Sequence, residues 1–333
     1  MKASHTRRVL LAQAAAAVAA LSGLPAAQAQ APAYPSKPIR LVVPFNAGGA
    51  TDILARTLAD KIAPKLGQPV LVENRGGASG IAGSEVVAKA APDGYTLLLS
   101  LTTSMLTNQF LFEKLPYNPQ RDFALVSLLA YGPVVLVAHP SVPANTGPEL
   151  LDYIARNKGK LAYGSWGVGS TAHLVGAFMS QSLKADMSHV AYKGEAPMLQ
   201  DLIGGQTQIA ISSAMGAKAH IESGKLKAIG VTGEQRMPVL PNVPTLSEQG
   251  LKDDVYRVVG WLGLAAPAKT PPEIVQRIAA EMAAAMALPD VRERVSAMGF
   301  PPAGTTPEQF NAVYQRDLPV WQNLVKLSGA KLD

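Results

Sequence analysis

The chain has 333 residues, of which 48% are hydrophobic and 16% are charged. This length and apolar content provide for one large core or two cores of ordinary domain size, and they exclude a disordered protein. The formal net charge of +6 does not indicate a nucleic-acid partner, because the charges form no long block and the few aromatic residues are not interleaved with Lys and Arg. Cysteine is absent, which excludes disulfides, thiol nucleophiles and Cys-ligated zinc.

Residues 1–29 have the pattern of a secretory signal peptide. Three basic residues precede an almost unbroken apolar run over residues 9–24, and a small-residue site, Ala27-Gln28-Ala29, follows it. The run is shorter than the roughly 20 apolar residues that a membrane anchor requires. Half of the net charge lies in this segment, since the remainder holds 27 basic and 24 acidic residues. We therefore expect export to the periplasm, by the general secretory route or, given Arg7-Arg8, by the twin-arginine route.

From residue 34 onward, short apolar segments alternate with segments of helical period. The predicted strands lie at residues 39–43, 69–73 and 95–100, and the predicted helices at 51–66 and 84–90. Alternation of this kind predicts a parallel sheet covered by helices.

A second α/β set follows the first. Its predicted strands lie at residues 134–138, 160–163, 189–192, 207–211 and 226–231, and its predicted helices at 148–157, 170–183, 196–203 and 216–222. Three further helices, at 271–288, 290–298 and 307–327, have no strands of their own, so we expect them to cover the first sheet. The pattern predicts residues 30–135 and 262–333 in lobe 1, residues 136–261 in lobe 2, and crossing segments near 131–140 and 256–268.

Two glycine-rich turns each connect a predicted strand to a predicted helix, one in each lobe. They are residues 44–52 (PFNAGGATD) and 163–171 (YGSWGVGST). The first backbone N–H groups of a helix have no intrahelical acceptor and the helix dipole is positive there, so such a turn favours a bound anion. Neither turn has the glycine spacing of a dinucleotide site or the lysine of a P-loop. Together they predict an anion site in a cleft between the lobes.

The polar residues near these turns allow more than one role. Asp52 is expected to organise its loop, because a carboxylate aimed at an anion would repel it. His173 is either a polar helix residue or a ligand contact. No histidine pair has metal-ligand spacing and no serine lies in G-x-S-x-G, so we expect no metal, and a catalytic site only if distant residues such as Ser170 and His173 assemble one.

A series of motifs runs in order along the chain, at residues 34–39 (YPSKPI), 43–52 (VPFNAGGATD), 73–75 (ENR), 93–98 (DGYTLL), 115–117 (LPY), 163–165 (YGS), 192–194 (YKG), 240–245 (LPNVPT) and 262–267 (LGLAAP). These motifs resemble the Bug (TctC) family, the periplasmic solute-binding receptors of tripartite tricarboxylate transporters. The resemblance implies a periplasmic-binding-protein-like (type II) fold, with two α/β lobes and a ligand cleft between them.

The resemblance also implies a function. The chain would be a receptor and not an enzyme, and it would capture a small organic acid without a cofactor. The expected ligands are di- or tricarboxylates, aromatic acids and acidic amino acids, delivered to a membrane transporter or a sensor. A secreted hydrolase with a noncontiguous Ser/His site on the same scaffold is the alternative.

From the turns and the resemblance together, we predict a set of ligand-binding residues. They are Phe45, Ala47, Gly48, Gly49, Thr51, Asp52, Thr102, Ser104, Ser165, Trp166, Gly169, Ser170, His173 and Ser212.

The chain departs from the usual family pattern near some of these residues. Residues 104–108 (SMLTN) stand where many members have a Thr-His pair followed by Ala-Ile-Asn, and Asn46 stands where many have Pro. Ser212-Ser213 stands where the family often has Asp-Asn after a strand. We therefore expect the cleft to lack an acid at this point, and the ligand to lack an amine that such an acid would bind.

Overall fold

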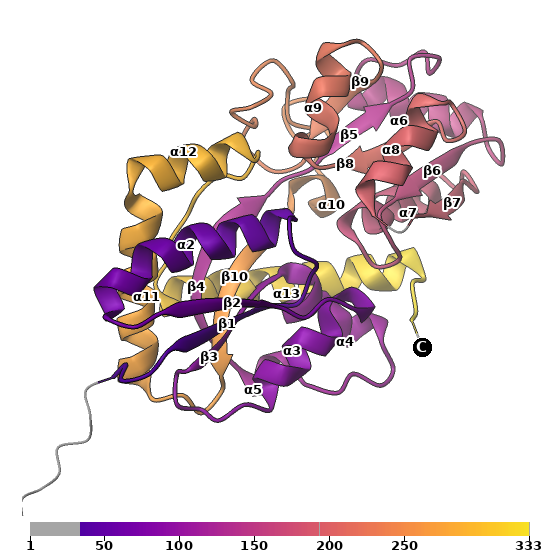
Figure 1. Cartoon of the computed structure of the whole chain (residues 1–333). Coiled ribbons are helices and arrows are strands. Elements are labelled where there is room, and N and C mark those ends of the chain that lie inside the picture. Colours follow the sequence, from indigo (N-terminus) through magenta and orange to yellow (C-terminus); the bar gives the residue numbers. More distant parts are fainter. Residues whose placement is uncertain (1–33, 193, 333) are drawn as a thin grey trace, which may run out of the picture. The chain divides into compact units, whose positions relative to one another are not determined.

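The computed structural model describes residues 34–192 and 194–332, so the predicted signal peptide lies outside the described residues. From Lys37 onward the chain forms two lobes, each built on a five-stranded mixed sheet with helices packed on it (Figure 1). The predicted two-lobed α/β fold is confirmed. Among the described residues, no helix combines the length and the apolar character needed to cross a membrane.

The sheet of lobe 1 has the strand order β2-β1-β3-β10-β4. Its strands are β1 (Ile39–Val43), β2 (Val70–Asn74), β3 (Thr96–Leu101), β4 (Phe123–Gly132) and β10 (Gly260–Pro267). β1 is parallel to β2 and β3, as predicted, whereas β10 is antiparallel to β3 and β4. The predicted parallel sheet is confirmed for β1, β2 and β3. β10 was not predicted as a strand, and it is antiparallel because it returns from lobe 2 and enters from the opposite end. β4 is a strand that the sequence pattern did not single out.

The helices of lobe 1 come from both ends of the chain. They are α2 (Ala50–Leu66), α3 (Ile81–Ala88), α4 (Asn108–Leu111), α5 (Pro119–Asp122), α11 (Pro272–Ala287), α12 (Pro289–Ala297) and α13 (Pro307–Ser328), with short turns η1 (Ala78–Gly80) and η2 (Thr103–Thr107). α11 and α13 pack against β4, and the Phe310 ring of α13 meets the Trp261 ring of β10 at 86°. The C-terminal helices thus cover the first sheet, as predicted.

The sheet of lobe 2 has the strand order β7-β6-β8-β5-β9. Its elements are β5 (Val135–Ala138), α6 (Gly147–Arg156), β6 (Ala162–Ser165), α7 (Thr171–Ser182), β7 (Ser188–Ala191), α8 (Glu195–Ile203), β8 (Ile209–Ser212), α9 (Ala214–Glu222), β9 (Lys227–Val231) and α10 (Asp254–Arg257). β6 is parallel to β7 and β8, and β5 is antiparallel to β8 and β9. The residue boundaries between the lobes remain a prediction.

The crossing segments leave each lobe from the edge that carries its glycine-rich turn. In lobe 1, Gly132 at the end of β4 pairs with Gly260 at the start of β10, and β4 runs in the same direction as β3. In lobe 2, Val135 at the start of β5 pairs with Ser212 at the end of β8. Both crossings therefore start and end where the parallel strands end, which turns these two edges toward each other.

Gly176 of α7 lies directly on Tyr163 of β6, and it supplies a test of this packing. A Cβ atom at Gly176 would lie 2.2 Å from the Tyr163 ring. Ala normally stabilises a helix by about 1 kcal/mol relative to Gly, but here the ring or the helix would have to shift. We expect Gly176→Ala to lower the free energy of unfolding by about 2 kcal/mol, measured by urea denaturation.

Removing the ring supplies the control. In a Tyr163→Leu background, Gly176→Ala should cost less than in the natural sequence, because the clash is gone. A Gly176→Ala variant that is more stable than the natural protein would contradict this account of α7 packing.

Candidate functional site

The turn between β1 and α2 leaves the N-terminus of α2 open. Gly48 has a φ of 86°, a left-handed conformation that glycine adopts without strain, and Ala47, Gly48 and Gly49 are exposed. Gly49 is the N-cap of this 17-residue helix and provides no side-chain acceptor. The N-terminus of α2 therefore follows an exposed turn and has no side-chain cap on its first N–H groups, an arrangement that suits a bound anion.

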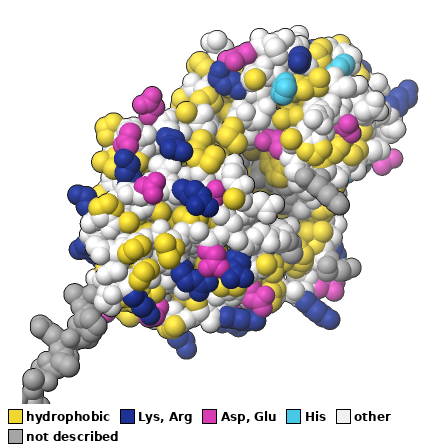
Figure 2. Space-filling view, viewed as in Figure 1, with side chains coloured by type: hydrophobic (Ala, Val, Ile, Leu, Met, Phe, Trp, Pro, Cys, Tyr) yellow, Lys and Arg dark blue, Asp and Glu magenta, His cyan; other side chains and the backbone are white. Residues whose placement is uncertain are grey.

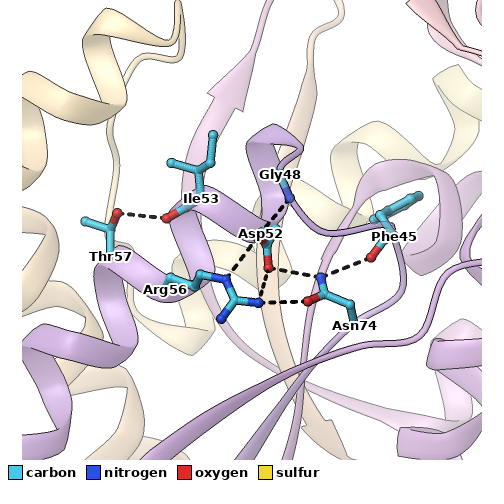
Figure 3. A network of polar contacts seen from close by, with 7 residues as sticks. All are labelled: Phe45, Gly48, Asp52, Ile53, Arg56, Thr57 and Asn74. Carbon is cyan, nitrogen blue, oxygen red and sulfur yellow. Dashed lines mark hydrogen bonds and ion pairs between the residues drawn. The ribbon is translucent and has the colours of Figure 1, made fainter.

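Asp52 holds this turn in place (Figure 3). Its Oδ2 accepts hydrogen bonds from Gly48 N–H at 2.9 Å and from Arg56 Nε at 3.1 Å, and its Oδ1 accepts one from Asn74 Nδ2 at 3.0 Å. Asn74 Nδ2 also donates to the Phe45 carbonyl at 3.1 Å. One carboxylate thus joins the turn, the first two turns of α2 and the end of β2, which agrees with an organising role for Asp52.

The environment of Asp52 favours its charged form. Asp52 is 3% exposed, and burial by itself would raise the pKa of its carboxyl group. Hydrogen bonds from Arg56, Gly48 N–H and Asn74 outweigh burial and hold the pKa of Asp52 below its usual value. The charge is paired with Arg56, whose NH2 group lies 3.0 Å from Oδ1, so it is not directed at a ligand.

The other predicted residues of lobe 1 differ in accessibility. Phe45 is half-buried, whereas Thr51, Thr102 and Ser104 are at most 5% exposed. Thr102 Oγ1 accepts from Trp261 N–H at 2.7 Å, which ties the end of β3 to β10. The Ser104 hydroxyl pairs with Ser100. The structure therefore places the Thr102 and Ser104 hydroxyls in contacts within the protein. The accessible part of the predicted set is the exposed turn of residues 47–49, in which the N–H of Gly48 is already bound to Asp52.

The glycine-rich turn of lobe 2 is closed by its own side chains. Ser170 caps α7, since its Oγ accepts from His173 N–H at 3.3 Å, and the same hydroxyl donates to the Gly167 carbonyl at 2.6 Å. Ser165 Oγ also donates to Gly167, at 3.1 Å. Trp166 is half-buried and packs against both hydrophobic clusters of the protein. The hydroxyl groups predicted to bind a ligand are thus engaged inside the turn.

Two uncharged histidines lie beneath this turn. The His173 and His189 rings stack with centroids 4.0 Å apart, and Tyr163 stacks on His189 at 4.9 Å. Gly169 N–H donates to His173 Nδ1 at 3.1 Å. Burial, with a smaller contribution from His189, lowers the pKa of His173 to about 4, and burial also lowers the pKa of His189. Near neutral pH the stack therefore lends the turn no positive charge.

An acid stands beside Ser212. Glu195, the first residue of α8, accepts through Oε1 from Ser212 Oγ at 2.7 Å and from Ser213 N–H, and through Oε2 from Ser213 Oγ at 2.8 Å. The expectation that this edge lacks an acid is therefore wrong, because the turn after β7 supplies the carboxylate. The absence of an amine from the ligand stays a prediction.

Direct contacts confirm that the two edges meet. A Cβ atom on Gly169, in the turn of lobe 2, would lie 2.5 Å from Leu111 of α4 in lobe 1. A Cβ atom on Gly299, which follows α12 in lobe 1, would lie 2.7 Å from Ala214 at the start of α9. The turn of lobe 2 and the start of α9 therefore lie against helices of lobe 1, and the predicted cleft stays a prediction.

The cavity found in the structure and the charges on the visible surface do not coincide with the predicted cleft. A cavity of about 640 Å³ lies along the crossing segments and α13, with Thr232, Val259 and Asp317 in its wall, and it contains none of the predicted ligand-binding residues. Lys, Arg, Asp and Glu side chains are interspersed over the face in Figure 2. On this face Lys and Arg form no patch free of acidic side chains, and the backbone at α2 stays the predicted source of positive potential for an anion.

Sequence reasoning missed four residues that shape the site: Arg56, Asn74, His189 and Glu195. For two of them, the sequence contains a feature that could have identified the residue. Arg56 is four residues after Asp52, the spacing of a helical ion pair, and the β1–β2 register that pairs Val43 with Asn74 puts Asn74 beside the turn. His189 and Glu195 had none, because their contacts depend on the order of strands in lobe 2.

The comparisons with known proteins agree with this geometry. Residues 54–329 match the family described as tripartite tricarboxylate transporter family receptor. A curated relative from Pseudomonas sp. strain P51, the UPF0065 protein in the tcbD-tcbE intergenic region, is 38% identical over 294 residues, which are 88% of this chain and 87% of the relative. Protein BugT from Bordetella pertussis is 34% identical over 308 residues, 92% and 94% of the two chains.

Solved structures with the same two-lobed fold include three similar proteins. The periplasmic binding protein BugD has 35% identity and a TM-score of 0.75, over 90% of this chain and 99% of BugD. An R. palustris protein with adipate has 31% identity and a TM-score of 0.78, over 90% and 100%. MatC from Rhodopseudomonas palustris with bound malate has 34% identity and a TM-score of 0.74, over 88% and 100%.

The Asp52 network predicts a loss of stability when its charge is removed. In Asp52→Asn the new amide N–H faces donors from Gly48 and Arg56, so we expect a fall of about 2 kcal/mol in the free energy of unfolding. Chemical denaturation measures it. Asp60→Asn, at an exposed position of the same helix, is the matched control and should change stability by less than about 0.5 kcal/mol. Equal effects of the two substitutions would contradict the role given to Asp52.

The histidine stack predicts a pH dependence. His173 has a pKa of about 4 in the folded chain and an ordinary value near 6.5 in the unfolded chain, so between these values the unfolded chain binds more protons. Stability should be complete above about pH 6.5 and fall as the pH drops toward 4, by as much as about 3 kcal/mol from this residue. Urea denaturation across this range measures the slope.

His173→Gln should flatten the slope, and His220→Gln, on α9, should leave it unchanged. An unaltered slope in His173→Gln would contradict the prediction. Paired carboxylates such as Asp52 also lose stability as the pH falls, but they do so at lower pH, because the pKa of Asp52 lies below its usual value.

Proposed function

The chain belongs to the tripartite tricarboxylate transporter receptor family, and on this premise we propose that it captures a small organic carboxylate between its two lobes. Members of this family are periplasmic binding proteins, not enzymes. The observation that carries the proposal is the open N-terminus of α2, where exposed backbone of residues 47–49 lacks a side-chain cap. A carboxylate there would accept hydrogen bonds from the first N–H groups of the helix.

The hydrolase alternative is dropped. One reason is that members of the family are not enzymes, and the hydrogen bonds supply a second. The Ser170 hydroxyl donates to the Gly167 carbonyl and not to a histidine ring, and His173 Nδ1 accepts from Gly169 N–H. A nucleophilic serine requires a base within hydrogen-bond reach of its hydroxyl. Ser170 and His173 therefore do not form the pair that this alternative needs. Ser165 Oγ does lie 2.7 Å from His189 Nε2, but Ser165 is fully buried, so its hydroxyl group is not accessible to a substrate.

The class of ligand is inferred from the ligands of similar proteins. One similar structure holds adipate and another holds malate, and both are carboxylates. Binding closes the lobes by rotation about the crossing segments, as in other two-lobed binding proteins. The protein is exported by the signal in residues 1–29, acts in the periplasm and passes its ligand to the membrane subunits of a transporter or to a sensor.

Ligand-induced stabilisation tests the proposal. A panel of mono-, di- and tricarboxylates, aromatic acids and acidic amino acids should contain a member that raises the stability by about 2.7 kcal/mol at one hundred times its Kd, seen as a thermal shift. Folded protein that responds to no member of the panel would count against carboxylate binding.

Gly49→Val tests the site. Gly49 has a φ of −79°, which valine tolerates, and a Cβ atom would meet only the Asn46 carbonyl, at 3.7 Å. The variant should fold, cover the N-terminus of α2 and lose most of the ligand-induced shift. Ala63→Val introduces the same side chain near the other end of α2 and should retain the shift. If Gly49→Val retained it too, the anion site would not lie at α2.

A further inference from the structure

The edge of lobe 2 at which its parallel strands end carries a fixed carboxylate, that of Glu195. We propose that Glu195 determines specificity, restricting the ligand to one carboxylate with a hydrogen-bond donor such as a hydroxyl group, and not a second carboxylate, at its far end. This inference rests on the proposed function and names its ligand class. The similar proteins with adipate and malate hold dicarboxylates, so the inference sets this chain apart from them.

Glu195 is held rigidly because it completes the cap of α9. Ser213 is the N-cap of α9, and its Oγ accepts from Gly216 N–H at 3.0 Å. In a capping box, a Glu or Gln at the position of Gly216 would reach back to the N-cap N–H. Gly216 has no side chain, and Glu195 takes that role from α8, with its Cδ only 2.7 Å from where a Gly216 Cβ would lie. Three hydrogen bonds from Ser212 and Ser213 fix the carboxylate.

The strand order places this carboxylate over the ligand edge. Glu195 follows β7 and its serine partners follow β8, while β6 lies between these two strands. The link from Glu195 to Ser212 therefore passes over the end of β6, where the glycine-rich turn begins at Ser165. Glu195 is half-buried, so the residue keeps part of its surface accessible.

The helix N-termini on this edge already hold polar side chains: α8 has no side-chain cap at Gly194 but begins with the acidic residue Glu195 itself, and α7 and α9 are capped by serines. α7 is capped by Ser170, and the N–H of Gly169 donates to His173. α9 is capped by Ser213, and Glu195 accepts the Ser213 N–H. A second ligand carboxylate would meet these satisfied donors and the charge of Glu195, whereas a carboxylate at α2 meets open N–H groups. Charge repulsion by Glu195 would lower the affinity for dicarboxylates without raising the affinity for other acids.

A hydroxyl group can donate to the hydrogen-bond acceptor site of Glu195 that the serines leave unused. A carboxylate has about four acceptor sites, and three are used by the two serines. One site on Oε2 is left for a donor, which a ligand hydroxyl supplies and a ligand carboxylate does not. The ligand would lie with its carboxylate at lobe 1 and its hydroxyl at lobe 2.

Matched ligand pairs test the inference by calorimetry. Each pair differs in one terminal group, as in succinate against 4-hydroxybutyrate and adipate against 6-hydroxyhexanoate. Each dicarboxylate in the panel described above is tested together with its matching hydroxy acid. The natural protein should bind the hydroxy acid at least about tenfold more tightly than its dicarboxylate, and Glu195→Gln should bring the ratio close to one.

Two controls separate selectivity from stability. Thr146→Ala removes the N-cap of α6, away from this edge, so it matches the loss of a cap in lobe 2 and should keep the natural ratio. Lys193 precedes Gly194 in the sequence and lies outside the described residues, and Lys193→Gln should leave the preference for the hydroxy acid in place.

The outcomes are distinct. Tighter binding of dicarboxylates by the natural protein, an unchanged ratio in Glu195→Gln, or a ratio controlled by Lys193 would each overturn the inference while leaving carboxylate binding intact. A natural protein that binds no acid of the panel would overturn the proposed function together with the inference.

Discussion

The shape of the glycine-rich turn of lobe 1 depends on one buried carboxylate, that of Asp52 at the end of the turn. Backbone N–H groups bind an anion well only if their directions are set before the ligand arrives, since ordering a flexible loop costs free energy. Asp52 sets them by accepting from Gly48 and by holding Asn74, which in turn holds Phe45. Because Arg56 pairs with the same carboxylate, the turn is fixed without leaving an unpaired charge beside the anion site.

The two lobes use similar turns in different ways. In lobe 1 the turn leaves a helix N-terminus open, whereas in lobe 2 Ser165 and Ser170 bond to Gly167 within the turn. The stack of His173 and His189 underneath is uncharged near neutral pH, since burial lowers both pKa values. The histidines beneath the turn of lobe 2 therefore add no positive charge there, which agrees with the proposed anion site at α2 in lobe 1.

Much of the fold followed from the sequence, because hydrophobic periodicity reports local burial directly. The strands β1, β3 and β5 and the helices α2, α7 and α13 lie within a few residues of their predicted ranges. Periodicity says nothing about direction, and β10 was not predicted as a strand, so its antiparallel entry was missed. The site followed less well, since a serine near a glycine-rich turn looks the same whether it faces a ligand or caps a helix. Ser170 and Thr102 were chosen for their hydroxyl groups, and the structure commits those groups to backbone partners.

The return of β10 to the first sheet has a consequence for the order of assembly. Lobe 2 is a continuous stretch of chain inserted between β4 and β10, and its sheet needs no strand from outside residues 135–231. Lobe 1 lacks an inner strand of its sheet until residues 260–267 arrive, and the helices that cover β4 come later still. A chain that emerges from its N-terminus can therefore complete the inserted lobe first, while the lobe that holds the open helix N-terminus waits for the end of the chain.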